Sequence, residues 1–163
     1  MSSDRLHQVE RSLTRLRDQL AGKEDTLTTI APEERVRIKQ QIADLKAEMQ
    51  PFEQEYWQLL VERSEICEIV EPAPEVVVAE IVEQVEQLQT NPQYSDEMLA
   101  WLQKIYAEVS KPGAPAAAKL KGALSLMPPF INLSYEGELD TENFLRTNFP
   151  TFTKWSKALA KKR

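Results

Sequence analysis

Cysteine and histidine are almost absent from this chain of 163 residues, which has one of each. A single cysteine, Cys67, cannot form an internal disulfide, and a single histidine, His7, has no partner for a nucleophilic triad or a zinc site. Glu136, Glu138 and Asp140 are spaced by two, as metal ligands on a strand would be, but no second ligand motif accompanies them. We therefore expect no enzyme activity, no catalytic residue and no bound metal.

Glycine is scarce as well, because only four occur and none forms a phosphate-binding loop. We accordingly expect no nucleotide or other cofactor. The sequence has no run of ~20 consecutive apolar residues that could span a membrane. Its first residues, Met1 to His7, lack the apolar run of a secretory signal. The expectation is a soluble, cytoplasmic protein.

The chain does have two long series of apolar residues with heptad spacing. This spacing predicts helices that pack against other helices, at about residues 4–30 and 32–71, on either side of a break at Ala31-Pro32. The first series is Leu6, Val9, Leu13, Leu16, Leu20, Leu27 and Ile30, and the second is Ile38, Ile42, Leu45, Met49, Phe52, Tyr56 and Leu59. Residues 1–71 are therefore predicted to form a long antiparallel helical hairpin, or coiled coil.

The register of this hairpin follows from reflecting the chain about the break. Leu13 then lies near Met49, and Leu27 lies opposite Val36, so that apolar residues meet at every turn. Pro51 removes a helical hydrogen bond, yet the apolar spacing continues in phase across it. We expect one kinked but continuous helix there.

Beyond Pro51 the apolar surface of the second helix widens. Phe52 and Tyr56 belong to the heptad series, whereas Trp57, Leu60 and Val61 lie beside it. A helix that is apolar on more than one face must be covered on more than one face. The five residues are therefore predicted to be interaction residues that dock the rest of the chain or a second protomer, and the isolated hairpin is expected to self-associate.

Charge is divided unevenly along the chain, although the formal net charge is only −6. Residues 73–110 carry seven acidic and one basic side chain, whereas residues 111–163 carry four acidic and nine basic ones. Most of the basic residues lie at the end, where they lack a paired aromatic platform for nucleic acid. They are Lys154, Lys157, Lys161, Lys162 and Arg163. This division favours a protein partner and predicts no nucleic-acid binding.

The break Glu71-Pro72-Ala73-Pro74 is the strongest predicted boundary, because two prolines in three residues disfavour a helix. After it, residues 75–110 are predicted to form a helical pair. The start of residues 75–90 is ambiguous, since three consecutive valines are also typical of a strand. A second helix at about 96–110 is indicated by Ser95, which is a favourable N-cap.

Residues 116–163 are predicted to form a C-terminal interaction module. A short helix from Ala116 to Met127 would be stopped by the Pro128-Pro129 pair. Residues 131–135 then alternate between apolar and polar side chains, which is the period of one short strand or extended segment.

Two short helices are predicted to meet at Pro150, with Thr151 as the cap of the last one. Lys154, Trp155 and Lys161 are predicted interaction residues of this module: the lysines are expected to contact an acidic partner or the acidic middle of the chain, and the Trp155 ring is expected to be buried. Residues 157–163 are then dispensable for folding. An alternative is that this basic amphipathic end touches a membrane surface, although so short a segment would bind weakly.

Two segments resemble parts of known proteins. Residues 20–60, which include APEERVRIKQQI and PFEQEYWQLL, resemble coiled-coil modules of cyanobacterial proteins with NLR-like (STAND/NACHT), TIR or protease-effector architectures. Residues 120–155, which include ALSLMPPF, SYEGELDTENF and FPTFTKW, resemble a C-terminal segment of the same proteins. The resemblance implies an adaptor module that recruits effectors in signalling or defence, and it transfers no catalytic residue.

The sequence predicts a mainly α fold. It consists of a hairpin at 1–71, a helical pair at 75–110 and a small module at 116–163 with at most one extended segment. The expected function is that of a non-enzymatic adaptor or scaffold that binds a protein partner and itself. The alternative is a regulator or effector that acts at a membrane surface through the basic C-terminus.

Overall fold

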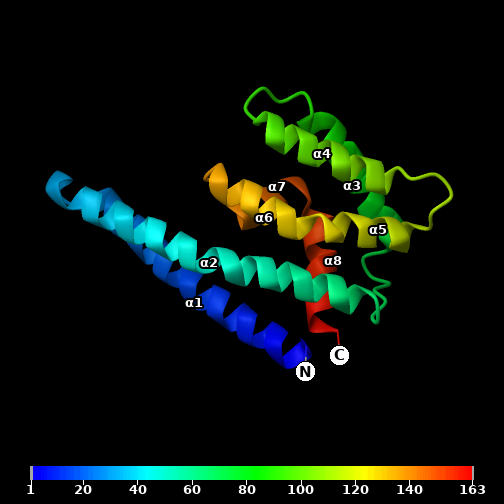
Figure 1. Ribbon diagram of the computed structural model, residues 1–163, viewed down its shortest axis with the longest axis horizontal. Coiled ribbons are helices and arrows are strands. Elements are labelled where there is room, and N and C mark those ends of the chain that lie inside the picture. Colours follow the sequence, from blue (N-terminus) through cyan, green and yellow to red (C-terminus); the bar gives the residue numbers. More distant parts are fainter. Residues whose placement is uncertain (1, 163) are drawn as a thin grey trace. The chain divides into compact units, whose positions relative to one another are not determined.

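The computed structural model describes residues 2–162, with side chains from Asp4 onward, and every regular element in that range is a helix (Figure 1). The mainly α fold class is confirmed. The helices are α1 (Ser2–Thr29), the short 3₁₀ helix η1 (Pro32–Glu34), α2 (Arg35–Ser64), α3 (Pro74–Leu88), α4 (Asp96–Val109), α5 (Ala116–Ser125), α6 (Met127–Glu136), α7 (Thr141–Asn148) and α8 (Pro150–Lys161).

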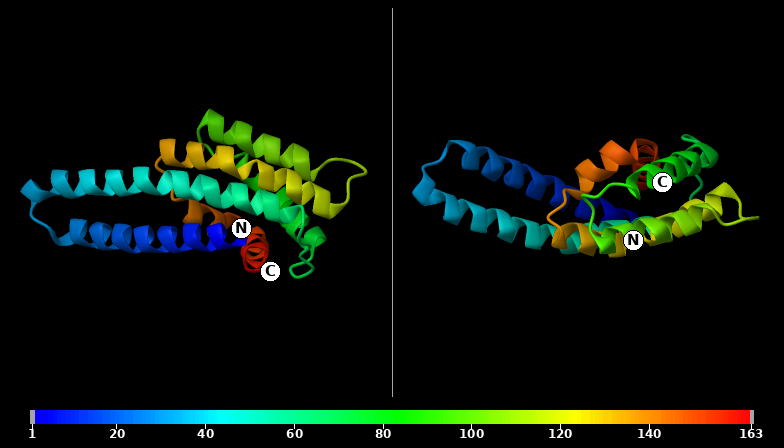
Figure 2. Two further views of the ribbon diagram at one scale, coloured as in Figure 1. Left: turned by 60° about the horizontal axis from the view of Figure 1, so that its bottom comes forward. Right: turned by 90° about the horizontal axis from the view of Figure 1, so that it is seen from above.

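The chain divides into two compact units, Met1–Tyr56 and Trp57–Arg163. The boundary falls inside α2, whereas the sequence places it at the prolines after residue 71. In the first unit α1 and α2 run antiparallel, as Figures 1 and 2 both show. Arg5 Nη2 donates to Glu55 Oε1 over 2.6 Å near one end, and Lys23 Nζ donates to Gln41 Oε1 over 2.7 Å near the other. The predicted helical hairpin is confirmed.

The heptad residues of the hairpin are buried along most of its length. Those below one tenth exposed are Leu6, Val9, Leu13, Leu16, Ile38, Leu45 and Met49. Near the turn the expected register fails, because Val36 is 78 % exposed and Leu27 only half-buried. The intervening η1 has about three residues per turn instead of 3.6, so a simple reflection of the chain does not hold beside it.

Helix α2 continues through Pro51, as predicted, but it ends at Ser64 and not near residue 71. Glu65, Glu68 and Glu71 would place negative charge at the negative end of a longer helix, which the helix dipole disfavours. Several β-branched residues follow Ser64, and their restricted side chains also lower helix propensity. The chain therefore leaves the helix early and crosses to α3 without regular structure.

In the second unit, residues 75–88 lie in α3, so the segment with three consecutive valines is a helix and not a strand. Helix α3 buries Val77, Val78, Ile81, Val85 and Leu88. Ser95 caps α4 as predicted, because its Oγ accepts a hydrogen bond from the Met98 N–H over 3.2 Å. Helix α5 packs on both α3 and α4. The segments 75–110 and 116–163 consequently share one compact unit.

The predicted strand at 131–135 is wrong, because these residues lie in helix α6. The proline pair follows the end of α5, as predicted, but it also lies in the first turn of α6. Proline lacks an N–H that the first turn does not use, and its fixed φ suits a helix start. The buried residues of α6 include Met127, Phe130, Ile131 and Ser134, spaced by three, one and three along one helical face.

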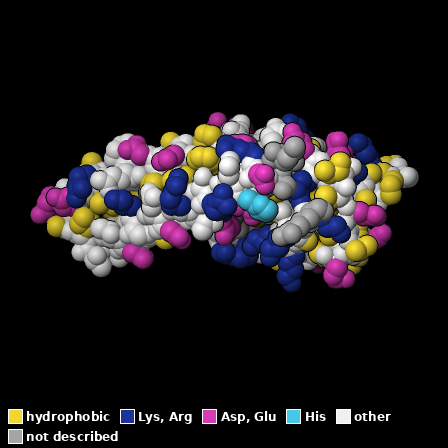
Figure 3. All heavy atoms as spheres, turned by 90° about the horizontal axis from the view of Figure 1, so that it is seen from below, with side chains coloured by type: hydrophobic (Ala, Val, Ile, Leu, Met, Phe, Trp, Pro, Cys, Tyr) yellow, Lys and Arg dark blue, Asp and Glu magenta, His cyan; other side chains and the backbone are white. Residues whose placement is uncertain are grey.

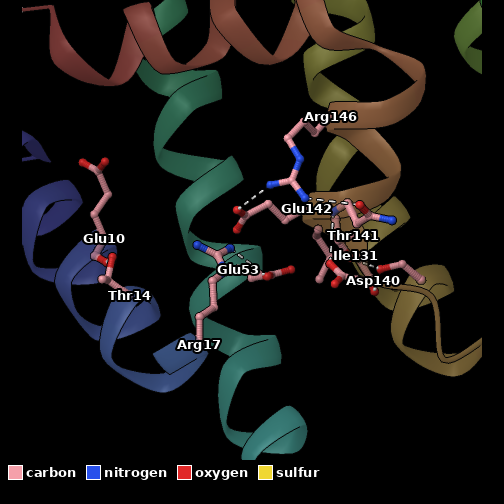
Figure 4. A network of polar contacts seen from close by, with 11 residues as sticks. Glu10, Thr14, Arg17, Glu53, Ile131, Asp140, Thr141, Glu142 and Arg146 are labelled. Atoms are coloured by element: carbon pink, nitrogen blue, oxygen red, sulfur yellow. Dashed lines mark hydrogen bonds and ion pairs between the residues drawn. The ribbon is translucent and has the colours of Figure 1, made fainter. Parts of the chain in front are cut away.

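Helices α6 and α7 are joined through short polar contacts, seen in Figure 4. Asp140 caps α7 by accepting from the Asn143 N–H over 3.1 Å. The buried hydroxyls of Ser134 and Thr141 are hydrogen-bonded to each other, so neither is left without a partner in the core. One turn apart on α7, Arg146 Nη1 and Glu142 Oε1 form an ion pair at 3.7 Å.

Aromatic rings form much of the core of this unit. Trp101 stacks on Phe130 with ring centroids 4.3 Å apart, and Phe144 lies 5.5 Å from Phe130 and 6.0 Å from Phe149. The indole N–H of Trp101 donates to the carbonyl of Leu126 over 2.9 Å. This cluster joins α4, α6 and α7, so residues distant in sequence share one core.

Candidate interaction surface

Helix α8 is held against the end of α2 by a row of stacked rings. Trp57 and Phe152 are parallel within 4°, with centroids 6.2 Å apart, and Phe152 lies 5.9 Å from Trp155. Trp57 and Trp155 are buried, and Leu60 is fully buried. The wide apolar face at the end of α2 is thus filled from within the chain. Two other residues predicted for this face are half-buried: Val61 in this unit and Tyr56 in the hairpin.

Several residues that were predicted to be interaction residues are buried in the structure. Trp57, Leu60 and Trp155 are core residues of the second unit. Phe52 is half-buried in the hairpin. The apolar surface of α2 that predicted self-association is therefore largely covered, and it is not a free docking surface.

Two polar contacts fix α8 further. Arg63, itself buried, donates from Nε to the carbonyl of Leu159 over 2.9 Å. At the other end, Glu80 of α3 accepts from the Thr151 N–H over 2.9 Å and from the Thr151 hydroxyl over 2.6 Å. The prediction that Thr151 caps α8 is therefore wrong: Phe149 is the N-cap residue, and the capping carboxylate comes from α3.

The lysines of α8, and Lys162 directly after it, lie at the surface. Lys154, Lys157, Lys161 and Lys162 are exposed, and none is in an ion pair with another described residue, while Arg163 lies outside the described range. We call these four lysines the basic face. The structure contradicts the expectation that residues 157–163 are dispensable, because Leu159 and Ala160 are buried.

Exposed apolar side chains gather at the crossing from α2 to α3. Four large hydrophobic residues are exposed within the described chain, and three of them lie close together in sequence: Ile66 (79 %), Val70 (74 %) and Val76 (57 %). Carboxylates lie between them in the sequence. Exposed acidic residues of the same stretch are Glu62, Glu65, Glu68, Glu71 and Glu75. We call residues 62–76 the acidic-apolar segment.

Several polar groups of the acidic-apolar segment form no hydrogen bond or ion pair within the described residues. Within residues 2–162, its five carboxylates form no ion pair or hydrogen bond. Over the same range the backbone N–H groups of Glu68, Ile69 and Val70 donate no hydrogen bond. Backbone donors of a folded protein are almost always paired or hydrated, so these N–H groups are available to bond with water or with a partner. The segment therefore offers polar groups as well as exposed apolar side chains.

A cavity of about 290 Å³ opens beside this segment. Residues 64–69 form one side, and Pro74, Ala117, Lys121 and Trp155 complete the lining. The lining mixes apolar groups with the half-buried thiol of Cys67, the exposed Lys121 and the carboxylates of the segment. It is large enough to accept one or two side chains of a binding partner.

Other polar groups have local structural roles or face solvent. No cluster of three potential metal ligands occurs among residues 2–162, and Asp140 of the predicted carboxylate series serves as a helix cap. The histidine side chain lies at the surface (Figure 3). In the hairpin, hydrogen bonds from Arg5 lower the pKa of Glu55. Burial raises the pKa of Tyr94.

Comparison with known proteins adds no relative. No protein-family model, curated protein or solved structure shows significant similarity to this chain. Among the described residues, no helix combines the length and apolar character needed to cross a membrane.

Proposed function

We propose that this protein is a non-enzymatic adaptor or scaffold that assembles with protein partners through the acidic-apolar segment. The observation that carries the proposal is the concentration of exposed Ile66, Val70 and Val76 within one short stretch. Single exposed apolar residues are ordinary, whereas a contiguous apolar patch with a polar rim is typical of a protein-binding surface. The surrounding glutamates supply that rim.

The hairpin provides the second half of this role. Its two helices form a long element whose outward side chains are mostly polar or charged. Long paired helices of this kind are common assembly elements. The resemblance to adaptor modules of bacterial signalling and defence proteins agrees with this use and supplies the proposed setting in the cytoplasm.

The alternative function, action at a membrane surface through α8, has support from the exposed lysines alone. The apolar residues of that helix, Phe152, Trp155 and Leu159, are buried in the second unit. Membrane binding by an amphipathic helix needs its apolar face to enter the lipid. We therefore expect no co-flotation with vesicles containing about one third anionic lipid at physiological salt.

Quantitative affinity capture from native lysate tests the adaptor role. The full chain and the double variant Ile66→Ser/Val70→Ser are immobilised at equal density, and captured proteins are quantified by mass spectrometry. The proposal predicts specific proteins retained by the wild-type chain and lost from the double variant. Val36→Ser is the matched control, because Val36 is equally exposed but lies in the hairpin. Equal capture by all three proteins would contradict the proposal.

A further inference from the structure

We infer that the partner of the acidic-apolar segment is the basic face of a second copy of this chain, so that two copies form a symmetric dimer. The inference deepens the assembly role proposed above and rests on it. It begins from two surfaces of opposite charge within the same unit, five glutamates on one and four lysines on the other, each without an ion pair among residues 2–162.

Both surfaces belong to the second unit, and α8, which carries the lysines, reaches the cavity beside the segment. Trp155 of α8 lines this cavity together with Glu65 and Glu68. A two-fold axis near this cavity would set the acidic-apolar segment of each copy against the basic face of the other. Such an arrangement forms the same contact twice and closes upon itself, which is the commonest symmetry of soluble oligomers.

The spacing of the charges fits this pairing. Lys154, Lys157 and Lys161 are separated by three and four residues, so they share one face of α8 and span about 10 Å at 1.5 Å per residue. Glu68 and Glu71 are three residues apart in irregular, non-helical backbone, where adjacent residues span up to about 3.5 Å. The outer lysines Lys154 and Lys161 and the pair Glu68 and Glu71 are therefore each separated by up to about 10 Å.

The segment also supplies an apolar centre for such an interface. Ile66, Val70 and Val76 lie among the glutamates, and from the partner copy the same side chains would meet them near the two-fold axis. The cavity beside Cys67 gives room for one of these side chains. An apolar centre within a charged rim is the usual composition of a protein interface. The basic face alone offers no apolar group, because the apolar side of α8 is buried.

Charge exchange between variants of the full chain tests the pairing. Sedimentation velocity at about 50 µM protein and low salt should show a wild-type dimer that dissociates at about 0.5 M NaCl, since salt screens exposed charges. Glu65→Lys/Glu68→Lys and Lys157→Glu/Lys161→Glu should each be monomeric. An equimolar mixture of these two variants should restore a dimer. The control Glu97→Lys/Lys104→Glu, which changes exposed residues of α4, should dimerise like the wild type.

A second measurement uses only the wild-type chain and so does not depend on how the variants fold. Carbodiimide cross-linking of an equimolar mixture of ¹⁴N- and ¹⁵N-labelled chains should join Glu65 or Glu68 of one copy to Lys157 or Lys161 of the other, with mixed isotope masses. A monomeric wild-type chain at low salt, dimers that survive charge reversal, or only intrachain cross-links would each overturn the inference. A monomer that still captures partners through Ile66 and Val70 would overturn the dimer and leave the adaptor role intact.

Discussion

At the scale of single residues, the aromatic side chains of the second unit separate folding from binding. Trp155 has the character of an interface residue in the sequence, since it lies among lysines, yet it is 5 % exposed and packs beside Phe152. Lys154 is its immediate neighbour and is exposed. Adjacent residues of one short helix therefore have different roles, and substitution distinguishes them.

We predict that Trp155→Ala lowers the free energy of unfolding by about 3–5 kcal/mol, because it deletes a large buried side chain. Lys154→Ala is the control and should change the free energy of unfolding by less than about 0.5 kcal/mol, as exposed substitutions usually do. Equilibrium urea denaturation measures both. A Trp155→Ala variant as stable as the control would mean that this ring is not part of the core.

Glu55 gives a prediction about pH. Hydrogen bonds from Arg5, followed by its charge, lower the pKa of Glu55 in the folded chain. A carboxyl group with a lower pKa in the folded state stabilises the fold above its unfolded pKa, about 4.3 for glutamate, and that contribution is lost as the pH falls through the folded pKa. Glu55→Gln should therefore be slightly less stable than the wild type at pH 7, and the difference should vanish well below pH 4.

Urea denaturation at a series of pH values measures this difference. We expect it to be small, because the side chains of Arg5 and Glu55 are 46 % and 35 % exposed and solvent screens the pair. Glu48→Gln is the control, since Glu48 is exposed on the same helix. A Glu55→Gln deficit that stays constant from pH 7 to pH 3 would show that the loss does not come from ionisation.

At the scale of elements, contacts between helices decide what the local sequence leaves open. Glu80 of α3 is bonded to the first turn of α8, 71 residues away. Sequence rules for helix starts consider only nearby residues, and they selected Thr151, which has the right side chain in the wrong position. A capping carboxylate from another helix has no local signal.

We predict that Glu80→Ala destabilises the chain by about 1–2 kcal/mol, the usual cost of losing a helix cap. Glu83→Ala is the matched control, because Glu83 is an exposed glutamate of the same helix, and it should have little effect. Thermal or urea unfolding compares the two variants. If both substitutions have the same effect, the contact between Glu80 and Thr151 does not hold α8 in place.

Helix α6 shows a different limit of prediction from sequence. The alternation of Ile131, Leu133 and Tyr135 has the period of a strand, but over so few residues it also fits one side of a helix. The preceding prolines also favoured the wrong prediction of an extended segment. A proline pair is compatible both with the end of one helix and with the start of the next. In contrast, the two hairpin helices were predictable because their apolar spacing persists over many turns.

The end of α2 could not be placed for a related reason. Apolar residues continue after Ser64, so periodicity alone suggested a helix up to the prolines. The glutamates at 65, 68 and 71 were a usable signal, because negative charge is unfavourable at a helix C-terminus. Their exposure beside Ile66 and Val70 could not be derived from the sequence, since apolar residues are buried by default.

At the scale of the whole molecule, the chain combines a helical hairpin with a compact helical unit that carries the acidic-apolar segment and the basic face. The sequence predicted the hairpin and the uneven charge. It also predicted an interaction surface on the apolar face of α2. In the structure, side chains of α8 cover that face at the end of α2, and the segment after α2 is exposed. The proposed assembly role therefore requires the central claim that residues 62–76 are covered when the chain assembles.

Hydrogen–deuterium exchange of the full chain, read by mass spectrometry, tests that claim most directly. The N–H groups of Glu68, Ile69 and Val70 donate no hydrogen bond within residues 2–162, so they should exchange rapidly in a dilute sample of about 1 µM. In the assembled state, either a concentrated sample or a captured complex, exchange across residues 62–76 should slow while peptides around Val36 remain unchanged. Assembly that protects other regions while residues 62–76 still exchange freely would contradict the account.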